Sequence, residues 1–172
     1  MAYTQDLTES SVFTALRSYI MGVLGTAVTQ VVLKPSNRVP MPKTYPFITM
    51  SPLFKMQIER PTVTTSSTVQ STMMPTEYHI QLDAYGPGAG DIMQILFTEF
   101  NSSDAYDAFT TPGIYPLYSD MPHQHPLVDE EAEYEVRWIM DVHLQYNPTL
   151  TNTVQTASTV TVGIINVEAA YQ

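Results

Sequence analysis

Four potential metal ligands, Asp120, His123, His125 and Asp129, lie within ten residues of the sequence. Imidazole nitrogens and carboxylate oxygens are ligands that zinc and manganese take in proteins. Such a site would support a metal-dependent hydrolase that uses His123 and His125. Prolines flank both histidines, however, and predict a loop over residues 119–130. We therefore expect a solvated or interface loop, with no bound metal and no cofactor, and the hydrolase remains an alternative.

A glycine-rich segment, GPGAG at residues 86–90, lies between a predicted strand and a predicted helix, where phosphate-binding loops occur. It matches neither G-x-G-x-x-G nor the lysine-bearing phosphate loop. Asp91 follows it and suits a helix N-terminus, but its charge opposes a phosphate. The segment therefore predicts a tight turn. The chain also has no cysteine, and its serines lie in no nucleophile-elbow motif. We predict that the protein is not an enzyme.

An acidic run occupies residues 129–135. Strand alternation places Glu131, Glu133 and Glu135 on one face, either as a solvated surface or as a surface that DNA passes without binding. The whole chain has 17 acidic and 7 basic residues and a formal net charge of −10. Because binding to phosphates requires clustered lysine and arginine, this charge argues against a protein that wraps DNA or reads its bases.

The strongest secondary-structure signal is a strand over residues 132–146, in which eight apolar residues alternate with mostly polar ones. Its apolar face includes Trp138, which we expect to be largely buried against helices. Ile139 is the apolar exception on the polar face. Ile139 and Tyr85, from the polar set of another strand, are candidate interface residues.

Helical spacing predicts a helix over residues 9–24, capped by Asp6 or Thr8 and ended by Gly25. Further helices are predicted over residues 91–100 and 104–109. Strands are predicted over residues 27–33, 47–59 (interrupted at Pro52), 77–85, 114–118, 132–146 and 157–167. These elements predict a single α+β domain over residues 1–172, in which two main helices pack on a mixed, antiparallel-rich sheet.

Residues 61–76 form a threonine- and serine-rich segment without a charge. Such a composition is typical of a flexible linker. Threonine and valine also favour strands, and strands are predicted on both sides, so we favour a protruding β-hairpin arm. Its candidate interface residues are Thr62, Val63, Thr64, Thr65, Thr68 and Val69. An isolated hairpin is only marginally stable, so we expect the arm to reach a neighbouring chain.

No apolar run is long enough to span a membrane, and the first residues lack the features of a signal peptide, so we expect synthesis in the cytoplasm and no membrane partner.

Several phrases, in this order, resemble the neck or tail-terminator proteins of contractile-tailed bacteriophages. They are NRVPMPK (37–43), FITMSP (47–52), QLDAYGP (81–87), PLYSD (116–120), YEVRW (134–138) and LQYNP (144–148), together with Asp141. The resemblance extends over about residues 9–165.

The resemblance implies a homohexameric ring at the top of the tail. Such a ring stops elongation of the tail tube and sheath and presents a surface to the head connector, while DNA only passes through its channel. It implies a virion protein that assembles in the host cytoplasm. Two other structural proteins stay open as alternatives, a different neck component and a tail-tube subunit.

Overall fold

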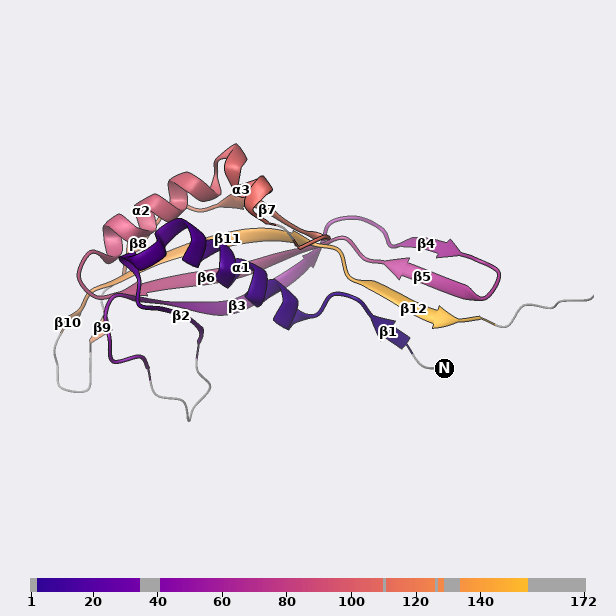
Figure 1. Cartoon of the computed structure of the whole chain (residues 1–172), viewed down its shortest axis with the longest axis horizontal. Helices are drawn as coiled ribbons and strands as arrows, with labels where there is room; N and C mark the ends of the chain where they lie inside the picture. The colour runs from indigo at the N-terminus through magenta and orange to yellow at the C-terminus, as the bar shows by residue number, and fades with distance from the viewer. Residues whose placement is uncertain (1–2, 35–40, 110, 126, 129–133, 155–172) are drawn as a thin grey trace, which may run out of the picture.

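The two larger sheets follow one another along the long axis of the molecule, and helices cover one face of the largest (Figure 1). The computed structural model describes residues 3–34, 41–109, 111–125, 127–128 and 134–154. The predicted strand over residues 157–167 lies outside these ranges. The α+β fold, with its antiparallel-rich sheet, is confirmed.

The larger sheet has six strands and forms the body of the protein. In spatial order it contains β2 (Gln30–Leu33), β3 (Phe47–Gln57), β6 (Thr76–Tyr85), β11 (Arg137–Tyr146) and β7 (Ile114–Ser119), and β8 (His123–Gln124) also pairs with β11. Only the pairing of β2 with β3 is parallel. β2 starts three residues later than predicted because residues 25–27 form a 3₁₀ turn, η1 (Gly25–Ala27).

Helix α1 (Glu9–Leu24) has the predicted bounds, and both ends have local causes. The Thr8 side chain accepts a hydrogen bond from the Ser11 amide, so Thr8 is the cap. Gly25 ends the helix with a positive φ of 53°. Helix α2 (Ala89–Phe100) begins two residues earlier than predicted, after Gly88 in a left-handed conformation.

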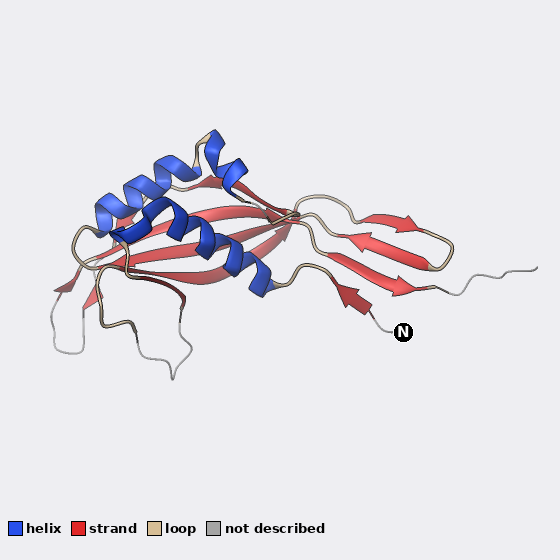
Figure 2. Ribbon diagram, viewed as in Figure 1, coloured by secondary structure: helices blue, strands red, loops and turns tan. Residues whose placement is uncertain are grey.

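Helix α3 (Ser103–Ala108) is shifted by one residue from its prediction. All three helices lie on one face of the six-stranded sheet (Figure 2). No helix of the described residues is long and apolar enough to cross a membrane.

The hydrophobic core lies between these helices and the sheet. Alternate residues of β6 and β11 face the helices and form the sheet side of this core. Its fully buried side chains include Leu16, Ile20, Ile80, Leu82, Met93, Leu96 and Met140. Trp138 packs against this core but is only half-buried, which corrects the expectation that it is largely buried. The predicted strand 132–146 is also interrupted at Val136, which lies between β10 (Tyr134–Glu135) and β11 and is 43% exposed.

The predicted arm is a β-hairpin, but it has partners in its own chain. It consists of β4 (Thr62–Thr65) and β5 (Val69–Met73), which form a four-stranded sheet with β12 (Thr149–Thr153) and β1 (Tyr3–Gln5). The order is β1-β12-β5-β4, and this arm sheet extends away from the helices (Figure 1). The pairing of β5 with β12 therefore supplies part of the stability that an isolated hairpin lacks.

The region predicted as a loop over residues 119–130 contains two short strands. β8 extends the edge of the six-stranded sheet, and β9 (Leu127–Val128) pairs with β10. Backbone pairing with β11 and β10 explains why this proline-flanked segment is extended and not irregular.

Candidate functional site

The sheet face opposite the helices carries a row of four aromatic rings. Phe54, His79, His143 and Tyr118 are paired residues of β3, β6, β11 and β7. Consecutive ring centroids are 4.1, 4.1 and 4.0 Å apart. His79 and His143 share this face because each lies between two core residues of its strand, and the register places Phe54 and Tyr118 beside them. We call these four residues the aromatic row.

Two β-bulges bring the outer rings of this row into register. The pairing of β3 with β6 shifts between Pro52 and Phe54, so Phe54 lies opposite His79. The pairing of β7 with β11 shifts next to His143, so Tyr118 lies opposite His143. Bulges re-aim side chains and are common beside functional sites, which makes the aromatic row a candidate site.

Glu77 lies beneath the two histidines of the row. Its Oε1 is 2.9 Å from His143 Nδ1 and 3.0 Å from His79 Nε2, and Tyr118 donates a 3.4 Å hydrogen bond to the same oxygen. The side chains of Glu77, His79 and His143 are 14%, 12% and 6% exposed. On the far side, His143 Nε2 is 3.5 Å from Asp120 Oδ2. The cluster therefore combines two imidazoles with two carboxylates, only one of which is exposed.

Asp141 lies at the edge of this cluster. Burial raises the pKa of its carboxyl group and nearby Asp120 raises it further, while the imidazoles of His143 and His123 lower it. The net effect is a raised pKa, so Asp141 binds a proton more readily than an exposed aspartate does.

A buried ion pair occupies the other end of β6. Asp83 is fully buried, and the Arg137 guanidinium donates to its Oδ1 at 2.9 Å. Gln81 and Thr49 donate to the same carboxylate at 2.7 and 3.3 Å. This buried pair links β6 to β11, and we interpret it as a structural element.

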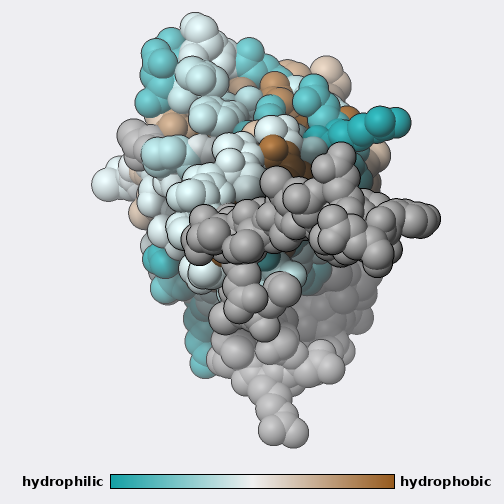
Figure 3. All heavy atoms as spheres, turned by 90° about the vertical axis from the view of Figure 1, so that its right-hand side faces the viewer, coloured by the Kyte–Doolittle hydropathy of each residue, from teal (hydrophilic) through white to brown (hydrophobic). Residues whose placement is uncertain are grey.

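The arm sheet presents exposed apolar side chains although its residues are mostly small and polar. Register places Val63, Leu150 and Tyr3 on one face, and all three are exposed. Viewed from the arm end, the visible described surface is largely pale and of intermediate hydropathy (Figure 3). Such a surface suits an uncharged contact with another protein better than a contact made through ion pairs.

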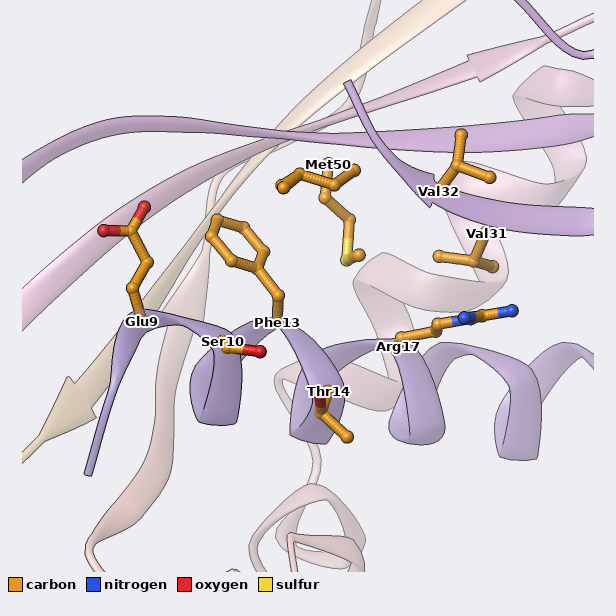
Figure 4. A pocket seen from close by; sticks show the side chains of 9 residues that line it. Glu9, Ser10, Phe13, Thr14, Arg17, Val31, Val32 and Met50 are labelled. Atoms are coloured by element: carbon orange, nitrogen blue, oxygen red, sulfur yellow. The ribbon is translucent and has the colours of Figure 1, made fainter. Parts of the chain in front are cut away.

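A groove of about 470 Å³ separates α1 from the edge strand β2. Its walls include Phe13 and Arg17 of α1 and Val32 of β2, and Phe13 rises toward Met50 of β3 (Figure 4). Because β2 is the outermost strand on this side of the described sheet, the groove follows a sheet edge.

The predicted interface residues differ in how far their side chains are exposed. All the arm residues, Thr62, Val63, Thr64, Thr65, Thr68 and Val69, are exposed. Tyr85 and Ile139, in contrast, are 3% and 8% exposed, because β6 and β11 are interior strands of the sheet. Tyr85 stacks on Phe47. Both side chains are buried within the chain, and their role at an interface stays a prediction.

The acidic candidates cannot be placed in the same way. Glu131 and Glu133 lie outside the described residues, and Glu135 belongs to β10. Of the predicted metal-binding set, Asp129 also lies outside. His123 and His125 are exposed, and among the described residues neither belongs to a group of three potential ligands. Asp120 alone joins a cluster, through His143.

Sequence reasoning missed the cluster of Glu77, His79 and His143. All three belong to the polar sets of their predicted strands, so they were visible as residues that face away from the core. The missing information was that β6 and β11 pair in a register that sets His79 opposite His143. Two histidines on polar faces of adjacent predicted strands are the signal that could have found it.

Comparison with known proteins bears on the whole chain. No curated protein matches it. A family model described as phage neck terminator protein matches residues 10–169, which include the described helices apart from the first residue of α1 and all described strands except β1. The match agrees with an arm sheet whose exposed side chains suit contacts with other proteins. The chain belongs to the phage neck terminator protein family and is a structural component of the virion neck.

Proposed function

We propose that this protein forms a homohexameric ring that caps the tail tube and sheath and joins the tail to the head connector. The ring stops tail elongation because its upper face lacks the strand edges on which a further tube ring would assemble. Family membership supports the coarse assignment to the neck. The arm sheet carries the finer proposal.

The arm supports ring formation through the free edge of its outer strand, β4. β4 is the last strand of the arm sheet, so one of its edges has no partner among the described strands. The Ser66 amide donates to the Val69 carbonyl, which makes residues 66 and 69 a hydrogen-bonded pair. Since such pairs alternate along an antiparallel ladder, the amides of Val63 and Thr65 point to the free edge. A neighbouring strand can pair there without requiring particular side chains.

The acceptor that we propose is the outer edge of β2 in the next subunit, beside the groove under α1. The groove offers Phe13, Val32 and Leu33 as apolar contacts for the arm, including its exposed Val63. Contacts of this kind repeat from subunit to subunit and close into a ring when the rotation permits.

A pair of variants at one residue tests the edge contact. Thr65→Pro removes the outward amide, whereas Thr65→Ala removes the same side chain and keeps that amide. We expect Thr65→Ala to form rings in sedimentation and electron microscopy, and Thr65→Pro to stay monomeric with an unchanged fold by circular dichroism. Rings from both variants would contradict the proposed edge pairing.

A crosslinking experiment tests the acceptor. The sequence has no cysteine, so a Thr65→Cys chain mixed with a Gln30→Cys or Leu33→Cys chain gives unambiguous disulfides. We expect disulfide-linked dimers with at least one of the two β2 positions and none with the control Tyr106→Cys, an exposed residue of α3. Dimers only with the control would place the arm elsewhere.

Capping is measured with tail tubes of the same phage. Rings added to growing tubes are expected to stop elongation and to be seen at one end only. Long tubes formed by this protein alone would favour the tail-tube alternative, and rings that bind heads but not tubes would favour another neck component.

We also propose that DNA passes a surface formed by Glu131, Glu133 and Glu135. Weak DNA binding by the wild type that becomes stronger on Glu→Gln substitution at these positions would support this proposal.

A further inference from the structure

We propose that Glu77, His79 and His143 form a binding site for a divalent transition metal ion, zinc above all. They are the one group of three potential ligands within the described residues. This inference concerns the open face of the body sheet and does not depend on ring formation.

The donor atoms already lie close to a coordination geometry. Glu77 Oε1, His79 Nε2 and His143 Nδ1 lie within 4.8 Å of one another, and the carboxylate oxygen is 3.0 and 2.9 Å from the two nitrogens. Ligand atoms of a tetrahedral zinc ion are about 3.3 Å apart, given bonds of about 2.0–2.1 Å. The two distances between the carboxylate oxygen and the nitrogens are close to this value, and rotation of the side chains would set the distance between the two nitrogens.

Without an ion, the cluster leaves buried nitrogen atoms unsatisfied. His79 Nε2 approaches Glu77 at 3.0 Å, but at an angle that does not make a hydrogen bond, and His143 Nε2 has no hydrogen-bond partner among the described residues. Buried polar atoms in folded proteins are nearly always satisfied. A metal ion that accepts the lone pair of His79 Nε2 satisfies the first of these atoms.

Asp120 offers a partner to the second atom, His143 Nε2, although the two do not form a hydrogen bond in this structure. If His143 binds the ion through Nδ1, its proton resides on Nε2, which is 3.5 Å from Asp120 Oδ2. A metal-binding histidine usually donates its other N–H group to such a carboxylate, which fixes the tautomer and the ring orientation. Asp120 therefore acts as a positioning residue outside the ligand set.

The type of donor selects the metal. Two imidazoles favour zinc, copper or nickel over magnesium and calcium, which prefer sites made only of oxygen. Three protein ligands leave a fourth position for water or for a group from another chain.

The surroundings hold the ligands in place. His79 stacks on Phe54 and His143 stacks on Tyr118, so both imidazoles lie between aromatic rings. His79 of β6 and His143 of β11 are paired residues and Glu77 also belongs to β6, so the bound ion would bridge these two strands. The proposal departs from the sequence-based expectation of no metal, which considered only the segment around His123 and His125.

The test uses full-length protein without a histidine tag, stripped with EDTA. We expect Co²⁺ to bind at about one equivalent with the visible absorption of a tetrahedral site, Zn²⁺ to displace it and raise the melting temperature, and Mg²⁺ to do neither. His79→Gln and His143→Gln are expected to weaken Zn²⁺ binding by more than about 100-fold, and Asp120→Asn by about 10- to 100-fold.

His123→Gln and His125→Gln are matched controls, because both histidines are exposed and lie outside the cluster. We expect them to bind Zn²⁺ as the wild type does. Glu77→Gln, which is nearly isosteric, gives a third ligand variant should a histidine variant fail to fold. The proposal is overturned if wild-type protein binds neither ion, if binding survives all the foldable ligand variants, or if the controls lose it equally.

Discussion

The hydroxyl group of Tyr78 donates a 2.7 Å hydrogen bond to Oε1 of Glu9, where helix α1 begins above the core. Lys55 approaches the other oxygen of the same carboxylate at 3.3 Å and lies over the Tyr78 ring. One exposed glutamate therefore links the first turn of α1 to both β3 and β6.

This arrangement predicts a pH dependence of stability. The Tyr78 hydrogen bond lowers the pKa of Glu9, burial opposes this effect, and Lys55 lowers the pKa further. Because the folded pKa lies below the ordinary value of 4.5, the stabilisation is present above pH 4.5 and is lost as the pH falls through the folded pKa. Urea unfolding between pH 6 and pH 3 should lose less stability in Glu9→Gln than in the wild type. Glu59→Gln, at an exposed residue, should behave as the wild type, and equal acid losses in all three proteins would refute the role of Glu9.

Asp6 predicts a local effect where the arm sheet meets the body. Its Oδ1 accepts hydrogen bonds from the amides of Thr149 and Leu7 at 2.7 and 2.6 Å. Burial raises its pKa, but these hydrogen bonds outweigh burial and lower it. Asp6→Ala should speed amide hydrogen exchange in β12 while exchange in β6 stays unchanged. Asp107→Ala, in exposed α3, is the control, and a uniform change across both sheets would show that Asp6 acts on global stability.

Trp138 and Met140 compare two degrees of burial on the same face of β11. Met140 is fully buried, whereas Trp138 is half-buried beside Gly90. Met140→Ala should cost about 3 kcal/mol of unfolding free energy and Trp138→Ala about 2 kcal/mol. The cost is smaller for Trp138 because only part of its side chain is buried against the core. Chemical denaturation measures both. A cost for Trp138→Ala well above that for Met140→Ala would indicate that the ring is more completely buried than the structure shows.

The pair of Asp83 and Arg137 predicts strong coupling. Arg137→Met leaves the fully buried Asp83 carboxylate without its cation and should cost about 3–5 kcal/mol. The double variant Asp83→Leu, Arg137→Met should cost less than the sum of the two single changes, because no uncompensated charge remains. Additive costs in this double-mutant cycle would show that the two side chains act independently.

Features with local causes could be predicted from the sequence. Thr8 satisfies the first free amides of α1, and Gly25 takes a positive φ that other residues avoid, so the helix has the predicted bounds. The alternation of β6 similarly identified the core side chains Ile80 and Leu82, because strand geometry alone sets which residues share a face. The arm hairpin was predicted from the strand preference of its threonines and valines for the same kind of reason.

Pairing between distant strands was decided only by the tertiary structure. The sequence placed Ile139 on a polar face and thus at the surface, but β6 and β8 flank it on both sides and bury it. The sequence likewise placed His79 and His143 on polar strand faces but did not show that they lie opposite each other. The register of β6 with β11 depends on the packing of the whole sheet. The sequence by itself determined the helix ends and the faces of the strands. The fold decided which faces meet, because contacts between residues far apart in the chain form only when the sheet and its core pack together.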